Sequence, residues 1–383
     1  MALVIGPGIS LFGINITNNG LPDPTKYYLY SWGKNNYGQL GLSNTTGYYS
    51  SPMQVGALTN WSSGSVCKQS TISIKTDGTL WAWGRNNSGQ LGLGNTTNYN
   101  SPKQVGALTN WLSVTAGGYF TVAIKTDGTL WGWGGNYYGM LGLGNTNYYS
   151  SPKQVGSLTT WLSVTAGAYH TVATKTNGTL WSWGLNNKGQ LGLGNTTNYN
   201  SPKQVGALTT WASVAASDYE TIAIKTDGTI WAWGWNQKGG LGLGNTNQYN
   251  SPTQVGALTN WLSVAAGGYR GFTIATKTDG TLWSWGSNPY GQLGLGNATY
   301  YSSPKQVGSL TNWLSVACGK YFTSSIKTDG TLWAWGANEA GQLGIGTGGP
   351  GQTVKSPTQV GALTTWSKLF HNGTSAFNLA LRL

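Results

Sequence analysis

Residues 111–160 read WLSVTAGGYFTVAIKTDGTLWGWGGNYYGMLGLGNTNYYSSPKQVGSLTT, and this stretch is one copy of a unit that recurs along a chain of 383 residues. A Trp-Gly pair marks every copy at steps of 50 to 52 residues, and its tryptophans are Trp32, Trp83, Trp133, Trp183, Trp233, Trp285 and Trp335. A glycine-rich unit of this length that carries strand-like segments is typical of a propeller. The seven copies predict an all-β, seven-bladed β-propeller of four-stranded blades.

The turn chemistry within one unit separates four strand candidates. They cover residues 111–116, 119–125, 129–133 and 153–155. Asp127-Gly128 lies between the second and third candidates, and an Asp-Gly pair supplies the positive φ that a tight hairpin needs. No segment of useful length has the 3.6-residue period of a helix.

The two ends of the repeat array complement each other. The last unit begins at Trp366 and offers a second strand at residues 375–381, but no third strand follows. Residues 28–33 match the third-strand pattern and have no first or second strand before them. We therefore expect the two segments to pair and close the ring, which removes the exposed sheet edges of an open array. This reading gives a propeller over residues 27–383 and an extension over residues 1–26.

The segment from Ser182 to Gly194 reads SWGLNNKGQLGLG and returns with small changes in every unit. This motif resembles the regulator of chromosome condensation repeat, whose members form seven-bladed β-propellers. The resemblance implies a fold more firmly than a function. Chromatin-bound relatives catalyse nucleotide exchange on a small GTPase through an inserted β-wedge, and the even spacing here leaves no room for one. Guanine-nucleotide exchange is therefore a minor alternative.

Twenty of the 21 tryptophans occupy repeated positions, and only Trp235 stands outside them. We interpret these twenty as core or interblade packing. The ultraviolet-B photoreceptors that share the repeat use a Gly-Trp-Arg-His-Thr motif. The matching segments here contain Tyr119 and Tyr169 in place of its tryptophan, which argues against photoreception.

The acidic residues and the histidines argue against catalysis. Five of the nine acidic residues are the repeated hairpin-turn aspartates, and Asp218 and Glu220 share one loop that we interpret as solvated. His170 and His371 have no partner at metal-ligand spacing. We predict no enzyme activity, no catalytic residues, no metal site and no cofactor.

The formal net charge of +12 favours anionic partners, although the repeated lysines suggest a diffuse basic belt. Specific nucleic-acid recognition is not expected, because no groove-entering helix is predicted. No apolar run is long enough for a membrane span, and the start of the chain lacks the basic segment of a signal peptide. Cys67 and Cys318 are expected to be buried and reduced.

Two positions vary freely between otherwise similar units. The residue after Trp-Gly is Lys34, Arg85, Gly135, Leu185, Trp235, Ser287 or Ala337, and the residue in the first loop is Ser70, Phe120, His170, Glu220, Arg270, Phe322 or Ser375. In an antiparallel meander both connections emerge on one face. We predict that this face binds a partner, either a protein or an anionic surface glycan. The leading contacts would be Trp235, Arg85, Arg270, Phe120 and Phe322, joined by His170, Glu220, Lys34 and Leu185; neutral drift on a tolerant rim is the alternative.

The opening segment suggests where such a module would act. Residues 2–9 resemble the start of structural proteins of marine tailed phages, and residues 9–16 could form a strand that docks on another virion or surface subunit. A plain tether is the alternative for residues 1–24. The leading hypothesis is a non-enzymatic virion or surface appendage that uses one propeller face for attachment. The alternative is a cytoplasmic regulator or enzyme inhibitor that binds one protein.

Overall fold

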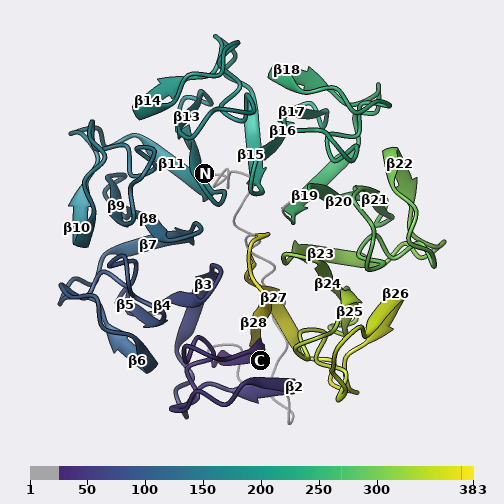
Figure 1. Ribbon diagram of the computed structural model, residues 1–383, viewed down its shortest axis with the longest axis horizontal. Helices are drawn as coiled ribbons and strands as arrows, with labels where there is room; N and C mark the ends of the chain where they lie inside the picture. Colours follow the sequence, from purple (N-terminus) through teal and green to yellow (C-terminus); the bar gives the residue numbers. More distant parts are fainter. Residues whose placement is uncertain (1–25, 269, 372) are drawn as a thin grey trace, which may run out of the picture.

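A ring of seven antiparallel sheets, each with four strands, surrounds a central axis in the computed structural model, which describes residues 26–268, 270–371 and 373–383 (Figure 1). The predicted all-β, seven-bladed propeller is confirmed. Within these described ranges, no helix combines the length and the apolar character needed to cross a bilayer. The docking strand predicted within residues 1–24 lies outside the described residues.

Each blade runs from an inner strand beside the axis to an outer strand at the rim (Figure 1). Six blades use four consecutive strands. They are β3 (Trp61–Val66), β4 (Ser70–Lys75), β5 (Leu80–Gly84) and β6 (Tyr99–Gln104); β7 (Trp111–Ala116), β8 (Phe120–Lys125), β9 (Leu130–Gly134) and β10 (Tyr149–Gln154); β11 (Trp161–Ala166), β12 (His170–Lys175), β13 (Leu180–Gly184) and β14 (Tyr199–Gln204); β15 (Trp211–Ala216), β16 (Glu220–Lys225), β17 (Ile230–Gly234) and β18 (Tyr249–Gln254); β19 (Trp261–Gly267), β20 (Phe272–Lys277), β21 (Leu282–Gly286) and β22 (Tyr301–Gln306); β23 (Trp313–Cys318), β24 (Phe322–Lys327), β25 (Leu332–Ala337) and β26 (Thr353–Gln359).

The seventh blade, called the closing blade here, is built from both ends of the array. Its strand order is β2 (Tyr48–Gln54), β1 (Tyr28–Lys34), β28 (Phe377–Arg382) and β27 (Trp366–Leu369). β1 and β28 pair antiparallel, with Leu29 opposite Leu381. Arg382 Nη1 donates a hydrogen bond of 3.2 Å to the Tyr30 hydroxyl, which lies 352 positions away. The predicted closure is confirmed.

The expected strands of the second complete blade match closely, except at the rim. β7 has the predicted bounds, whereas β10 begins at Tyr149, four residues before the expected start. Its pairing with β9 is irregular between Tyr149 and Lys153. β10 is the outer strand of its sheet, so the missing N–H of Pro152 does not disrupt a second ladder.

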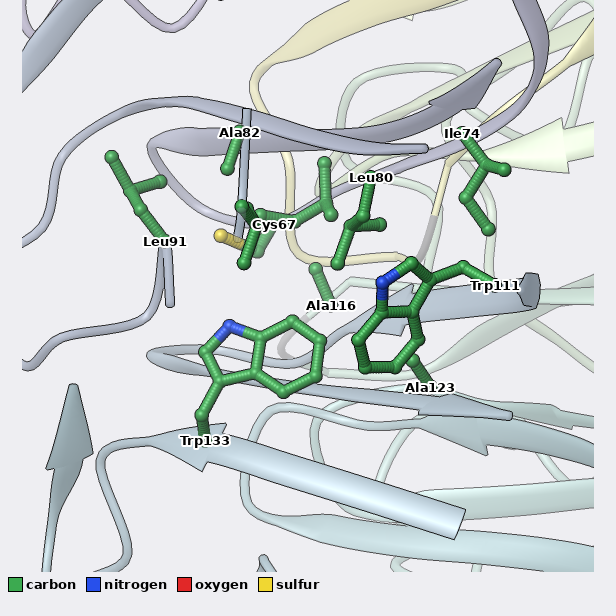
Figure 2. Close-up of a cluster of buried hydrophobic side chains, with 11 residues drawn as sticks. Cys67, Ile74, Leu80, Ala82, Leu91, Trp111, Ala116, Ala123 and Trp133 are labelled. Atoms are coloured by element: carbon green, nitrogen blue, oxygen red, sulfur yellow. The ribbon is translucent and has the colours of Figure 1, made fainter. Parts of the chain in front are cut away.

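Tryptophans join neighbouring blades. The rings of Trp111 and Trp133 lie 5.8 Å apart, and both pack against Cys67, Leu80 and Leu91 of the preceding blade (Figure 2). Trp133 Nε1 also donates a 3.0 Å hydrogen bond to the carbonyl of Gln90 in that blade. The predicted packing role is confirmed for the tryptophans that open each first strand and for those that precede glycine, all of which are buried. Cys67 and Cys318 are buried and free, as predicted.

The close approach of these indoles explains one recurring glycine. Gly142 has φ of 74°, and a Cβ atom placed on it would lie 2.8 Å from Nε1 of Trp183. A side chain at this position would therefore clash with the indole and would strain the backbone.

Candidate binding face

Both variable connections emerge on one end of the ring, and we call this end the variable face. It consists of the connections between the first and second strands and between the third and fourth strands of each blade. Backbone hydrogen bonds tie the two connections together: the amides of Gly135, Leu185 and Trp235 donate to the carbonyls of Tyr119, Tyr169 and Tyr219 at 2.8, 2.9 and 3.0 Å. The expectation that both variable sets share a face is confirmed.

The register of the first variable set differs from the prediction in two blades. Phe120 lies opposite Gly134, and the residues in the same place elsewhere are Phe272 opposite Gly286 and Phe377 opposite Gly33. Arg270 and Ser375 therefore do not occupy the equivalent position. Two added residues near Arg270 lengthen this connection and leave the Arg270 side chain exposed.

Five of the nine predicted contacts are buried and do not offer a surface. Phe120 and Phe322 are both 0% exposed, and Phe120 packs with Val122, Met140 and Leu141. The expectation that these aromatic rings are exposed is wrong, because the second strand begins beneath the loops and its first side chain points between blades. The other three buried predicted contacts are His170, Glu220 and Leu185.

Two of these buried residues are titratable, and burial disfavours the charged form of each. Burial lowers the pKa of His170 to about 3, and its Nε2 lies 3.0 Å from the Thr221 hydroxyl. Burial raises the pKa of Glu220 well above its ordinary value, against the hydrogen bond from Ser217. Burial therefore favours the uncharged form of both side chains.

The remaining predicted contacts are accessible. Arg85 and Trp235 are half-buried, as is Lys34, while Arg270 is exposed. Arg85 Nη1 donates a 2.6 Å hydrogen bond to the Gln69 side chain, and its guanidinium carbon lies 5.0 Å from the centroid of the Tyr37 ring. The Trp235 ring packs edge-on against Tyr219 at 5.6 Å.

Sequence reasoning missed a set of cations and tyrosines around the axis. Lys68 Nζ lies 5.0 and 5.2 Å from the rings of Tyr119 and Tyr169, and Lys320 Nζ lies 4.9 Å from Tyr321. Each of these tyrosines stands directly before the buried residue that opens a second strand. The recurrence of tyrosine at one place in the unit was the available signal.

Asp218 is the acidic group of this cluster. It is 5% exposed, contrary to the solvated loop predicted for it, and its Oδ1 has no hydrogen-bond partner. Burial raises the pKa of Asp218 to about 6, although the charges of Lys68 and Lys320 act to lower it. Within the described residues, no group of three potential ligands could hold a metal ion.

The opposite face of the ring is uniform and carries its acids in turns. Asp127 Oδ1 accepts hydrogen bonds of 2.9 and 2.6 Å from the amide and hydroxyl of Thr129, and these bonds lower the Asp127 pKa. Six repeated lysines beside these turns are buried, so their predicted place on a diffuse basic belt is wrong. They are Lys75, Lys125, Lys175, Lys225, Lys277 and Lys327.

Comparison with known proteins supports the fold. The pattern described as the regulator of chromosome condensation (RCC1) repeat matches residues 28–68, 77–124, 127–174, 177–224, 227–274, 279–326 and 329–369. The crystal structure of human WBSCR16 is similar at a TM-score of 0.82 and 20% identity, over 93% of this chain and 98% of that one.

Two yeast structures are similar to the same degree. Prp20p from Saccharomyces cerevisiae, described with its binding properties to Gsp1p and histones, has a TM-score of 0.81 and 18% identity over 94% of this chain and 92% of its own. Yeast RCC1 (Prp20) bound to Kap60 has a TM-score of 0.81 and 17% identity over 98% of this chain and 96% of its own. At these identities the likeness shows a common fold.

Proposed function

The chain belongs to the regulator of chromosome condensation repeat family, and we propose from this premise that it is a non-enzymatic binding module that docks an acidic partner protein on its variable face. The observation that carries the proposal is the segregation of charge and aromatic rings between the two ends of the ring. Proteins of this fold have quite different roles, so the fold alone does not specify a partner and the surface of this chain supports the proposal.

Among the described residues, the accessible charges of the variable face are mostly positive. Asp218 and Glu220 are buried there, and Glu339 is exposed. The basic side chains of this face are Lys34, Lys68, Arg85, Lys188, Lys238, Arg270 and Lys320. Such an excess steers an acidic partner toward the face and raises the association rate at low salt.

Aromatic rings accompany these cations and supply the contact area. Lys188 Nζ lies 5.9 Å from the Trp235 ring, and Tyr138 packs against Tyr169 at 6.0 Å. Half-buried aromatic rings and arginines dominate the energetics of protein interfaces. The combination supports a docking surface for a protein better than a site for a small molecule.

The named relatives add support of a general kind. Prp20p is described with binding to Gsp1p and histones, and yeast RCC1 was crystallised with Kap60. These partners belong to those proteins. They support the proposal that this propeller also presents a face to other macromolecules.

A double variant tests the docking surface. We expect Trp235→Ala with Arg270→Ala to weaken binding of a labelled, Glu-rich 20-residue peptide at least about tenfold in fluorescence anisotropy, without a change in Tm. Leu208→Ala with Leu258→Ala is the matched control, because these exposed leucines lie on the opposite face. Equal peptide affinity for wild type and the Trp235/Arg270 variant would contradict the proposal.

Three finer readings are distinguished by location and activity. Display on a virion or surface rests on residues 2–9, whereas a cytoplasmic inhibitor would form a stoichiometric complex with one protein. Mass spectrometry of purified particles against a cytosolic fraction separates these two. Nucleotide exchange would appear as accelerated release of labelled GDP from a small GTPase. The repeat steps of 50 to 52 residues argue against this activity, because they leave no room for an inserted β-wedge.

A further inference from the structure

A shallow groove of about 320 Å³ lies at the rim of the variable face, where the closing blade meets the next blade. Tyr37 and Thr45 from the β1–β2 connection form one wall. Asn98 and the β6 residues Tyr99, Ser101 and Lys103 form the other. We call this space the closing groove.

The side chains of the closing groove have the chemistry of a sugar site. Tyr37 and Tyr99 offer ring faces on which the C–H face of a pyranose can pack, and the neighbouring hydroxyl and amide groups can both donate and accept. No carboxylate lines the groove, and its one formal charge is the exposed ammonium of Lys103. The volume is near the lower end of ligand pockets, about 300 Å³, which suits a short saccharide segment.

Arg85 adds positive charge behind one wall. Its guanidinium carbon lies 5.0 Å from the centroid of the Tyr37 ring, and its Nε is buried without a hydrogen-bond partner. A guanidinium held against the tyrosine raises the potential of the groove, because the ring and the surrounding protein screen it less than water does. The favoured saccharide is therefore anionic.

The junction that forms the closing groove also departs from the other six. Ser43 has φ of 62° and is the one non-glycine residue with positive φ among the described residues. Its amide donates a 2.9 Å hydrogen bond to the carbonyl of Asn100, a further residue that lines the groove. The residues that take the place of Ser43 elsewhere are Gly94, Gly144, Gly194, Gly244, Gly296 and Gly346. Backbone strain of this kind often accompanies a functional site.

The chain contains a matched junction two blades further on. Gly139 approaches Asn200 there as Gly38 approaches Asn100 at the closing groove, with nearest Cβ distances of 2.4 Å in both cases. Leu185 stands in place of Arg85, and Gly144 in place of Ser43. The other residues are unchanged in type and are Tyr138, Thr146, Asn198, Tyr199, Ser201 and Lys203.

We propose that the closing groove binds an anionic oligosaccharide, with a sugar ring packed on Tyr37 and Tyr99 and a sulfate or carboxylate paired with Lys103. Arg85 strengthens the attraction from behind Tyr37. This site goes beyond the protein-docking surface of the variable face, which centres on Trp235 and Arg270. The saccharide site and the protein-docking surface can therefore be disproved independently of each other.

Titration calorimetry with a heparin-derived hexasaccharide at low salt tests the site in the full chain. We expect Tyr37→Ala and Lys103→Ala each to lower the affinity at least about tenfold, and Tyr138→Ala and Lys203→Ala to change it by less than about twofold. Trp235→Ala with Arg270→Ala is expected to leave this affinity unchanged. Maltohexaose, which has the same length without charge, is expected to bind at least about tenfold more weakly than the hexasaccharide.

Three results would overturn the proposal. Equal losses from Lys103→Ala and Lys203→Ala would indicate a diffuse basic surface. Equal affinity for maltohexaose would remove the anionic class. Tighter binding of an oligo-dT hexamer that also depends on Tyr37 would assign the groove to single-stranded nucleic acid. A Tm for Tyr37→Ala within error of wild type would show that a lost affinity reflects the groove and not unfolding.

Discussion

Lys225 Nζ lies 3.6 Å from the centroid of the Trp231 ring and 5.2 Å from that of Trp211, so the ammonium group is held between two tryptophans. The same arrangement recurs in five other blades, where the shorter distance is 3.7 to 3.9 Å. A cation over an indole ring recovers part of the cost of its burial. These lysines therefore belong to the structure of the blades, although the sequence presents them as surface charge.

Chemical labelling should separate the two kinds of lysine. We expect Lys103 and Lys203, which are exposed on outer strands, to react readily with an amine-directed ester, while Lys125 and Lys225 stay protected in the native protein. Mass spectrometry of peptides after brief labelling measures this. Labelling in guanidinium chloride is the control, because all four should then react alike. Comparable native reactivity at Lys225 and Lys203 would contradict the structure.

Ser43 should be replaceable with a gain in stability. At its φ of 62° a β-carbon is unfavourable, so Ser43→Gly is expected to raise the free energy of unfolding by about 1 kcal/mol. Gly144→Ser is the reverse experiment and should cost a similar amount, since only Ser201 Oγ, at 3.6 Å, lies near the added Cβ. Urea denaturation of both variants checks the pair. A stabilising Gly144→Ser would show that φ does not decide the effect.

The closing blade should control the stability of the whole ring. Deletion of residues 366–383 removes β27 and β28 and exposes an edge of β1, so we expect the thermal transition to collapse. Leu379→Ala is a milder test and should cost about 2–5 kcal/mol, because Leu379 is fully buried. Leu363→Ala, at an exposed position, should change stability by less than about 0.5 kcal/mol. A truncated protein that melts like the intact one would refute closure.

His170 should make the fold sensitive to mild acid. Its folded pKa of about 3 is below the unfolded value of 6.5, so its stabilising effect is complete above pH 6.5 and is lost as pH falls toward 3. The full effect is on the order of 3–5 kcal/mol. Phe occupies the same place in other blades, so His170→Phe should fold. Its free energy of unfolding should lack the pH dependence that His170 causes.

The measured quantity is the difference in unfolding free energy between wild type and His170→Phe from pH 7 to pH 4. Subtraction is necessary because Asp218, whose pKa is raised to about 6, gains stability as pH falls over the same range. A difference that does not change with pH would show that His170 titrates as it does in water.

The turn aspartates should lose their contribution to stability at a lower pH than His170 does. Hydrogen bonds from threonine lower the pKa of Asp127 and its counterparts below 3.8, so their stabilising effect is present above about pH 4 and is lost as pH falls through the folded pKa values. In one turn the uncharged residue Asn177 takes the place of the aspartate, and its Oδ1 accepts a 2.7 Å hydrogen bond from the Thr179 hydroxyl. Changing all five residues to Asn should flatten the fall in Tm below pH 4. These residues are Asp77, Asp127, Asp227, Asp279 and Asp329.

The sequence was sufficient to predict the architecture, because the same residues mark the same strand boundaries in every copy of the repeat. Trp111 and its counterparts fix where each first strand starts, and the Asp-Gly turns fix the second and third strands. The register near Arg270 could not be read in the same way, since two added residues keep the alternation of a strand unchanged. Only the pairing of Phe272 with Gly286 shows the shift.

Burial on the variable face was harder to predict, because it depends on the neighbouring blade. Phe120 stands at the boundary between a loop and a strand, where the sequence gives no indication of what covers it. Gly117 and the next blade's Ala166 close over this ring. The cations near the axis were missed for a related reason: Lys68 approaches Tyr169, which lies 101 positions along the chain.

The pairing of β1 with β28 has a consequence during synthesis. β1 emerges from the ribosome early, yet the strand that covers its inner edge is made last of the 28. Throughout elongation the nascent chain therefore carries a β1–β2 hairpin with an unpaired edge on β1, and such an edge can pair with a strand of another polypeptide. Slow translation or crowded polysomes should therefore favour strand exchange between neighbouring chains, and a circular permutant that starts at β3 would escape this hazard.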